Sequence, residues 1–121
     1  MSDIDVRRVT SNFAALIRQT DIYREYDFQK NKLKRQPDLF QKVNEYRRKN
    51  YDLQQEEEGE ALYEKMEQFE KEWEMFRENP LVDDFLKAEL AFCRMMQDIN
   101  VQLTTELDFE YPGHMRRAFT V

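Results

Sequence analysis

Hydrophobic residues recur every three or four positions along most of the chain, which is the spacing of one face of an α-helix. Four such stretches are separated by breaks. The first predicts a helix that begins between Asp3 and Ser11 and ends near Arg35. The second predicts a helix from Pro37 to about Gln54, because proline is accepted in the first turn of a helix.

The third and fourth stretches are joined by a very short connection. The third predicts a helix from Gly59 to Glu78. It ends at Asn79 because a residue before proline avoids the helical conformation. The fourth predicts a helix from Pro80 to about Leu107. So short a connection favours an antiparallel pair, and we expect these two helices to form a long hairpin.

The two arms of this expected hairpin differ in the width of their apolar faces. The helix at 59–78 carries a narrow seam, whereas apolar positions cover about half of the circumference of the helix at 80–107. The latter must therefore also contact the first two helices or another subunit. We expect an all-α bundle of about four helices in one domain at 1–107, followed by a tail at 108–121. The residues expected in a packing or oligomer seam are Met66, Phe69, Trp73, Phe76, Phe85, Phe92 and Met96.

Composition supports a single helical domain. The chain has 121 residues, of which 2 are Gly and 3 are Pro, so helix breakers are few. The formal net charge is −6, which argues against a general phosphate-binding surface. No stretch resembles a signal peptide or a membrane span, and we expect a soluble, cytoplasmic protein.

Few residues could carry out chemistry. The single Cys93 excludes an intrachain disulfide and a cysteine-only metal site, and the single His114 excludes a site that needs two imidazoles. The sequence contains no glycine-rich phosphate loop and no convincing Ser/His/Asp set. We therefore expect no enzyme activity, no catalytic residue, no metal and no cofactor.

One carboxylate, Glu89, falls in the middle of the apolar face of the last predicted helix. A buried carboxylate needs partners or takes up a proton. The stripes of the first two helices offer Thr20, Tyr23, Arg47 and Asn50. We expect a small polar network that joins the last helix to the first two and sets their register. A binding site for a partner or ligand, or catalysis, are the alternatives.

Two short charged regions leave a second function open. The basic clusters are Lys30, Lys32, Lys34 and Arg35, and then Arg47, Arg48 and Lys49. Basic residues interleaved with tyrosines are typical of nucleic-acid surfaces, although cations late in a helix also suit its dipole. RNA contact is therefore the alternative function. The acidic segment 54–60 is interpreted as a solvated turn or, alternatively, as a partner-binding patch.

Several motifs resemble those of the YlbF/YmcA (Com_YlbF) family of small helical bacterial proteins. The resemblance covers about residues 8–107. It is carried by Leu16-Ile17, Tyr23, Tyr26, Pro37-Asp38, Tyr46-Arg47 and Asn50, and most specifically by Asn79-Pro80-Leu81-Val82, Phe85-Leu86-Lys87-Ala88-Glu89 and Cys93-Arg94-Met95-Met96-Gln97-Asp98-Ile99.

The resemblance implies an all-helical, self-associating and non-enzymatic regulatory protein. The best-known members act in a complex that supports competence, sporulation and biofilm development and modulates RNA maturation by RNase Y. Some such complexes carry iron–sulphur clusters on cysteines outside the helical core, whereas the cysteine of this chain lies within a predicted helix. We therefore expect an adaptor that binds protein partners and forms a homo-oligomer.

Overall fold

The structure, a computed structural model, describes residues 2–112. Within this range the chain forms helices and no strand, which confirms the predicted all-α class. The helices are α1 (Asp3–Ile17), α2 (Asp21–Lys34), α3 (Pro37–Glu56), α4 (Gly59–Glu72), α5 (Glu74–Arg77) and α6 (Pro80–Glu106).

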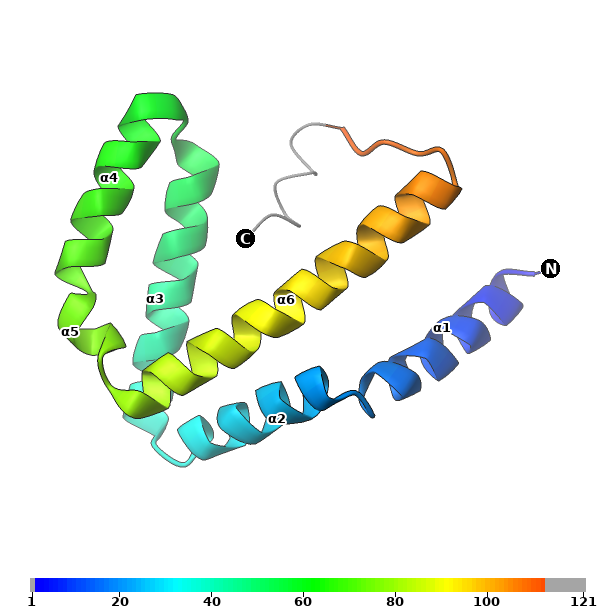
Figure 1. Cartoon of the computed structure of the whole chain (residues 1–121), viewed down its shortest axis with the longest axis horizontal. Helices are drawn as coiled ribbons and strands as arrows, with labels where there is room; N and C mark the ends of the chain where they lie inside the picture. The colour runs from blue at the N-terminus through cyan, green and yellow to red at the C-terminus, as the bar shows by residue number, and fades with distance from the viewer. Residues whose placement is uncertain (1, 113–121) are drawn as a thin grey trace.

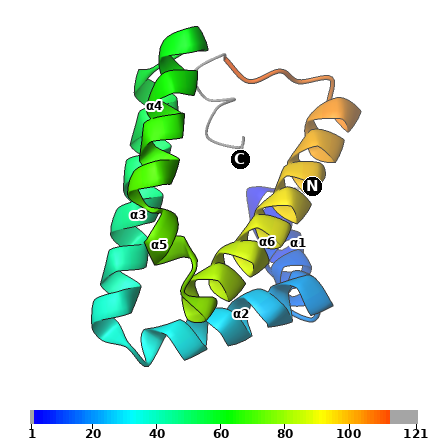
Figure 2. The same cartoon turned by 60° about the vertical axis from the view of Figure 1, so that its left-hand side comes forward.

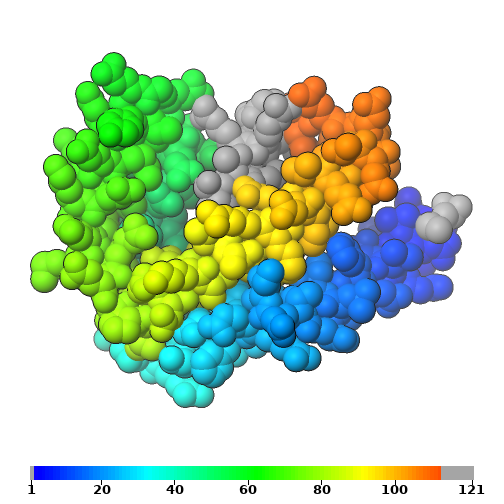
Figure 3. Space-filling view, viewed as in Figure 1, coloured from blue at the N-terminus to red at the C-terminus, as the bar shows by residue number. Residues whose placement is uncertain are grey.

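The helices are arranged as two arms that meet at one corner and open like a V (Figures 1 and 2). One arm is the antiparallel pair α3 and α4, and the other is α6 with α2 packed along it. In the space-filling view, α2 lies against the first half of α6 (Figure 3). The short helix α5 sits at the corner and contacts α6. Helix α1 extends beyond the end of α2.

The corner of the V is held by fully buried aliphatic and aromatic side chains. Leu33 of α2, Val43 of α3 and both Val82 and Phe85 of α6 pack together there with at most 1 % of their surfaces exposed. Burying side chains of this size stabilises the fold by roughly 1.5–3 kcal/mol each. The corner is therefore the part of the molecule that fixes the two arms relative to each other.

A second cluster joins the two helices of the first arm. Tyr46 of α3 stacks on Phe69 of α4, with ring centroids 5.1 Å apart, and meets the edge of Trp73 at 5.5 Å. All three residues are buried. The narrow seam expected on the helix at 59–78 is thus used against α3.

The predicted hairpin between the helices at 59–78 and 80–107 is not the arrangement observed. Helix α4 packs against α3, and the most extensive contact of α6 is with α2. At the short connection at Asn79, the short helix α5 lies between α4 and α6 in the chain and contacts α6. Pairing follows aromatic contacts instead: Tyr26 of α2 stacks on Phe92 of α6 with 5.0 Å between ring centroids. A short loop makes two helices adjacent at one end but does not force them to pack along their lengths.

The single helix predicted over residues 3–35 is also wrong, because the chain breaks between α1 and α2. Thr20 adopts an extended backbone with ψ 150°, and its hydroxyl accepts a hydrogen bond from the Tyr23 backbone N–H at 3.1 Å. This is the geometry of an N-cap, a role that threonine fills well. Thr20 therefore starts a new helix rather than continuing the first.

The helix predicted at 59–78 is interrupted at Trp73, where the backbone leaves the helical region with ψ 8°. The indole at this point is buried against Tyr46 and Phe76. The predicted helices at 37–54 and 80–107 are observed as α3 and α6 with ends shifted by one or two residues.

Candidate protein-interaction site

A cleft of about 250 Å³ lies between the two arms near the corner of the V. Helices α3, α4, α5 and α6 all contribute to its walls. Its lining combines apolar side chains with amides, carboxylates, an arginine and the only cysteine. The lining residues are Tyr46, Asn50, Gln54, Met66, Phe69, Glu70, Arg77, Leu86, Glu89, Leu90 and Cys93.

Glu89 bridges the arms at the edge of this cleft. Its Oε2 lies 2.6 Å from Nη2 of Arg47 on α3. The Glu89 side chain is 16 % exposed, whereas that of Arg47 is 43 % exposed. The carboxylate has therefore lost more of its contact with water than the guanidinium has. The Arg47 Nη1 also donates a hydrogen bond to Asn44 at 3.1 Å, which orients the guanidinium. The contact is a close ion pair, but Glu89 Oε2 receives no well-aligned hydrogen bond.

The protonation of Glu89 reflects this setting. Burial raises the pKa of Glu89 above its usual range, and the charge and hydrogen-bonding capacity of Arg47, followed by the charge of Lys30, oppose that rise. The net direction is upward, so desolvation outweighs the neighbouring cations.

The other members of the expected network fall in different places. Asn50 lines the same cleft as Glu89 and accepts a hydrogen bond from Gln54 at 3.5 Å. Tyr23 packs its ring on Phe92 with 5.5 Å between centroids. Thr20 is occupied as the N-cap of α2, and its hydroxyl donates to the Ile17 carbonyl at 2.7 Å. The structure therefore brings Arg47 to Glu89, places Asn50 nearby, and engages Thr20 in a local cap.

Two residues near Glu89 were missed from the sequence. The pKa of Tyr26 is raised by burial and then by the charge of Glu89, which places the phenol in the same electrostatic environment. Tyr26 lies one helical turn after Tyr23, so its position in the stripe was a usable signal. Lys30, one turn further on, was interpreted only as part of a basic cluster.

Most of the expected packing or oligomer seam is used within the chain. Phe69 and Trp73 are buried with Tyr46, and Phe85 is buried at the corner. Met66, Phe76 and Phe92 are half-buried. Met96 is 41 % exposed, and it is the member of the set most accessible to a partner.

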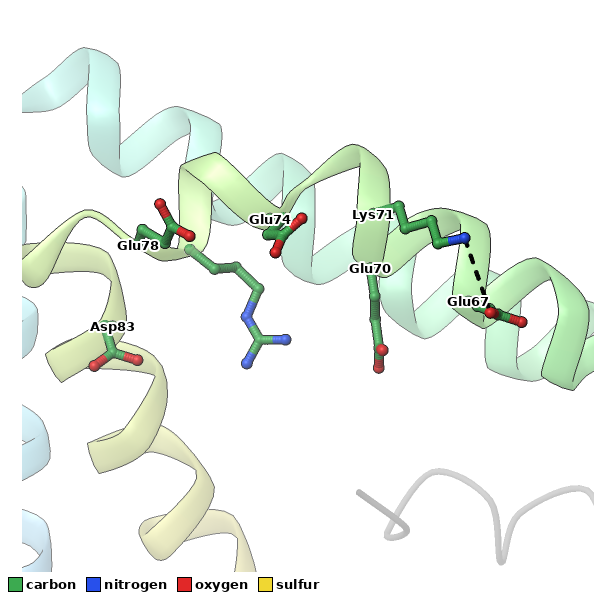
Figure 4. Close-up of a pocket in the computed structure, with 7 residues that line it drawn as sticks. Glu67, Glu70, Lys71, Glu74, Glu78 and Asp83 are labelled. Atoms are coloured by element: carbon green, nitrogen blue, oxygen red, sulfur yellow. Dashed lines mark ion pairs between the residues drawn. The ribbon is translucent and has the colours of Figure 1, made fainter.

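An acidic surface adjoins the cleft where α4, α5 and α6 meet. Figure 4 shows carboxylates from α4 and from the start of α6 facing the same open space. Lys71 lies 3.9 Å from Glu67, a loose surface pair. Glu70 and Arg77 line both this surface and the cleft, so the two regions are continuous. The acidic members are Glu67, Glu70, Glu74, Glu78 and Asp83.

The basic clusters are not presented as one open surface. Arg47 is paired with Glu89, and Lys49 lies 3.0 Å from Glu45 and 5.2 Å from the Trp73 ring centroid. Lys30 and Lys32 also lie over aromatic rings. These contacts hold several of the cations against the fold.

The cleft offers little for catalysis or metal binding. Burial and then the charge of Glu89 raise the pKa of the Cys93 thiol, which disfavours the nucleophilic thiolate. Among residues 2–112, no group of three or more His, Cys, Asp or Glu side chains is placed to hold a metal ion. His114 lies outside the described residues.

None of the described helices combines the length and the apolar character needed to cross a membrane. A search of curated proteins and a search of solved structures found no match. A family model does match, over residues 7–108, and its description is "Control of competence regulator ComK, YlbF/YmcA". The match covers most of the chain and indicates a regulatory role, and the chain belongs to the YlbF/YmcA family.

Proposed function

We propose that this protein is a non-enzymatic regulatory adaptor that binds protein partners through helical surfaces and acts as a homo-oligomer. The observation that carries the proposal is the cleft between the arms, whose walls come from four helices. A cleft of this size can take side chains from a helical segment that lies across it, as grooves between helices do in other recognition systems. The regulatory description of the family supports the same function.

The lining of the cleft suggests the chemistry of its partner. Met66, Leu86 and Leu90 offer apolar surface to an entering side chain. Glu70 stands at the junction with the acidic surface, so positive residues that flank the apolar ones would meet favourable charge. The partner segment proposed is therefore an amphipathic helix with a basic flank.

The family also suggests the setting of this adaptor. We propose that it works in a complex that modulates RNA processing by RNase Y and thereby affects competence, sporulation and biofilm development. An adaptor fits that setting because it needs a specific surface and no chemistry of its own.

Quantitative affinity capture tests the adaptor function. The full chain is used as bait in its native cells, and Glu70→Lys is compared with the wild type. Glu64→Lys is the matched control, since Glu64 is also an exposed glutamate of α4 but does not line the cleft. We expect a defined partner set that Glu70→Lys loses and Glu64→Lys keeps. Equal capture by all three baits, or no specific partner of the wild type, would contradict the proposal.

A further inference from the structure

Helix α1 carries an apolar seam that nothing in the described chain covers. Val6, Val9, Phe13 and Leu16 follow one another at intervals of 3, 4 and 3 residues, the spacing of a coiled-coil seam. They are 53, 57, 41 and 61 % exposed, and no residue of α1 is buried. A helix of 15 residues gains little stability from its own hydrogen bonds, so its seam needs a surface to pack against.

The second half of α6 presents a matching apolar face. The α6 face that carries Phe85 and Phe92 is covered by Tyr26 of α2. At roughly 100° per residue, Met96, Ile99 and Leu103 continue the same face beyond the end of α2. Met96 is 41 % and Leu103 is 52 % exposed, and Ile99 between them is half-buried, so most of this continuation is uncovered.

The antiparallel pairing of α2 with α6 fixes which residues of these two surfaces correspond. Leu33 packs with Phe85, and Tyr23 packs with Phe92. Continued at the same register, the pairing would set Leu16 beside Ile99 and Phe13 beside Leu103. The break at Thr20 turns α1 away before this can happen, and both surfaces stay exposed.

We propose that a second copy of this chain completes the contact: α1 of each copy packs antiparallel along the second half of α6 of the other. The result is a dimer of reciprocally exchanged helices. If the two-fold axis runs parallel to the helices, it does not shift a residue along the helix direction. The α1 residue that would lie beside a given α6 residue within one chain therefore lies beside that residue of the other chain. This inference gives the proposed self-association its partner and contact, and it rests on that part of the proposed function.

The ends of the two helices also match in charge. The antiparallel pairing sets the N-terminus of α1, the positive end of its dipole, beside the C-terminus of α6, the negative end of its dipole. A second copy therefore fits by helix dipole as well as by apolar spacing.

The reciprocal arrangement doubles the contact. Helix α1 has 15 residues and is about 22 Å long at 1.5 Å per residue. Because each copy contributes both α1 and the end of α6, it buries two helix faces rather than one. Stable protein interfaces bury about 800 Å² per partner, so a reciprocal contact is better suited to a stable dimer than a single pair of helices.

Light scattering on the purified full chain tests the dimer directly. We expect twice the chain mass for the wild type and a shift to the single-chain mass, with at least tenfold weaker association, for Phe13→Asp and Leu103→Asp. Ile4→Asp and Val101→Asp are the matched controls, because these residues are 70 and 60 % exposed on the opposite faces of the same helices. The controls should remain dimeric. A wild-type monomer at high concentration would overturn the proposal.

A mixing experiment separates exchange from folding back within one chain. In a Cys93→Ser background, chains with Leu16→Cys are mixed with chains with Ile99→Cys and oxidised. We expect a linked species of twice the chain mass from the mixture and not from either chain alone. A third chain carries both Leu16→Cys and Ile99→Cys. A link that forms within this chain, with none between the two singly substituted chains, would overturn the exchanged dimer. Circular dichroism must first show wild-type helicity in each variant, and the capture experiment tests the adaptor function separately.

Discussion

Arg47 Nη2 lies 2.6 Å from Glu89 Oε2, and this ion pair ties α3 of one arm to α6 of the other. The pair lies beside the buried corner, since the Arg47 guanidinium is 5.9 Å from the Phe85 ring centroid. The contact therefore lies where a small change in the angle between the arms would alter the shape of the cleft. We interpret it as a positional link between the arms, because the desolvation of Glu89 offsets much of the attraction.

Glu89→Ala should lower the stability of the fold measurably. The substitution removes a largely buried side chain and the link to Arg47, and we expect a loss of about 1 kcal/mol, or about 4 °C in Tm. Glu67→Ala is the control, because it removes only a loose, exposed pair with Lys71 and should change stability by less than about 0.5 kcal/mol. Thermal unfolding followed by circular dichroism measures both. An unchanged melting curve for Glu89→Ala would remove the structural role of this residue.

The pH dependence of stability should carry the signature of Glu89. Because the pKa of Glu89 is raised in the folded state, folding favours its protonated form. That contribution is complete below the unfolded pKa and is lost as the pH rises through the folded pKa. Relative to Glu89→Gln, the wild type should therefore gain stability as the pH is lowered from 7 toward about 4.5. Urea unfolding of both proteins across this range measures the difference, and a pH-independent difference would contradict the raised pKa.

The spacing of apolar residues was enough to locate most of the helices, because a long amphipathic helix has apolar residues at every third or fourth position of its own sequence. Pro37 and Pro80 correctly predicted where α3 and α6 begin, because the proline ring fixes a backbone angle that suits the first turn of a helix. The break at Thr20 was missed because a threonine can lie within a helix or cap the start of one. Which of the two occurs depends on the backbone conformation, and here Thr20 is the N-cap of α2. Trp73 was missed for a similar reason: its burial against another helix accompanies the interruption.

Which helices pair was not evident from the sequence, because pairing depends on contacts between distant segments. The apolar face around Phe92 could accept several helices, and the rings of Tyr23 and Tyr26 fill it in the structure. Part of the candidate site could be predicted from the sequence. A carboxylate within an apolar face identified Glu89, and Arg47 was among its candidate partners, but the acidic surface near Asp83 arises only where α4, α5 and α6 converge.

Thr20→Ala should destabilise α2 by about 1 kcal/mol, the usual effect of removing an N-cap hydroxyl. The substitution removes the acceptor for the Tyr23 N–H. Thr10→Ala is the control, because the Thr10 hydroxyl only donates to the Val6 carbonyl within α1, where alanine is a better helix former. Urea unfolding at equilibrium measures both free energies. Equal effects of the two substitutions would show that the cap does not contribute to the break between α1 and α2.

The isolated protein should show no salt-sensitive affinity for RNA. Its net charge is −6, and the Arg47 and Lys49 side chains that could bind phosphate are held by Glu89 and by Glu45. A protein that neutralises several phosphates loses affinity steeply as salt rises, because it releases counterions from the nucleic acid. Filter binding of a labelled RNA at about 50 and 200 mM salt therefore distinguishes the two functions. Tight binding at low salt that weakens steeply at high salt would favour the RNA-contacting alternative over the adaptor.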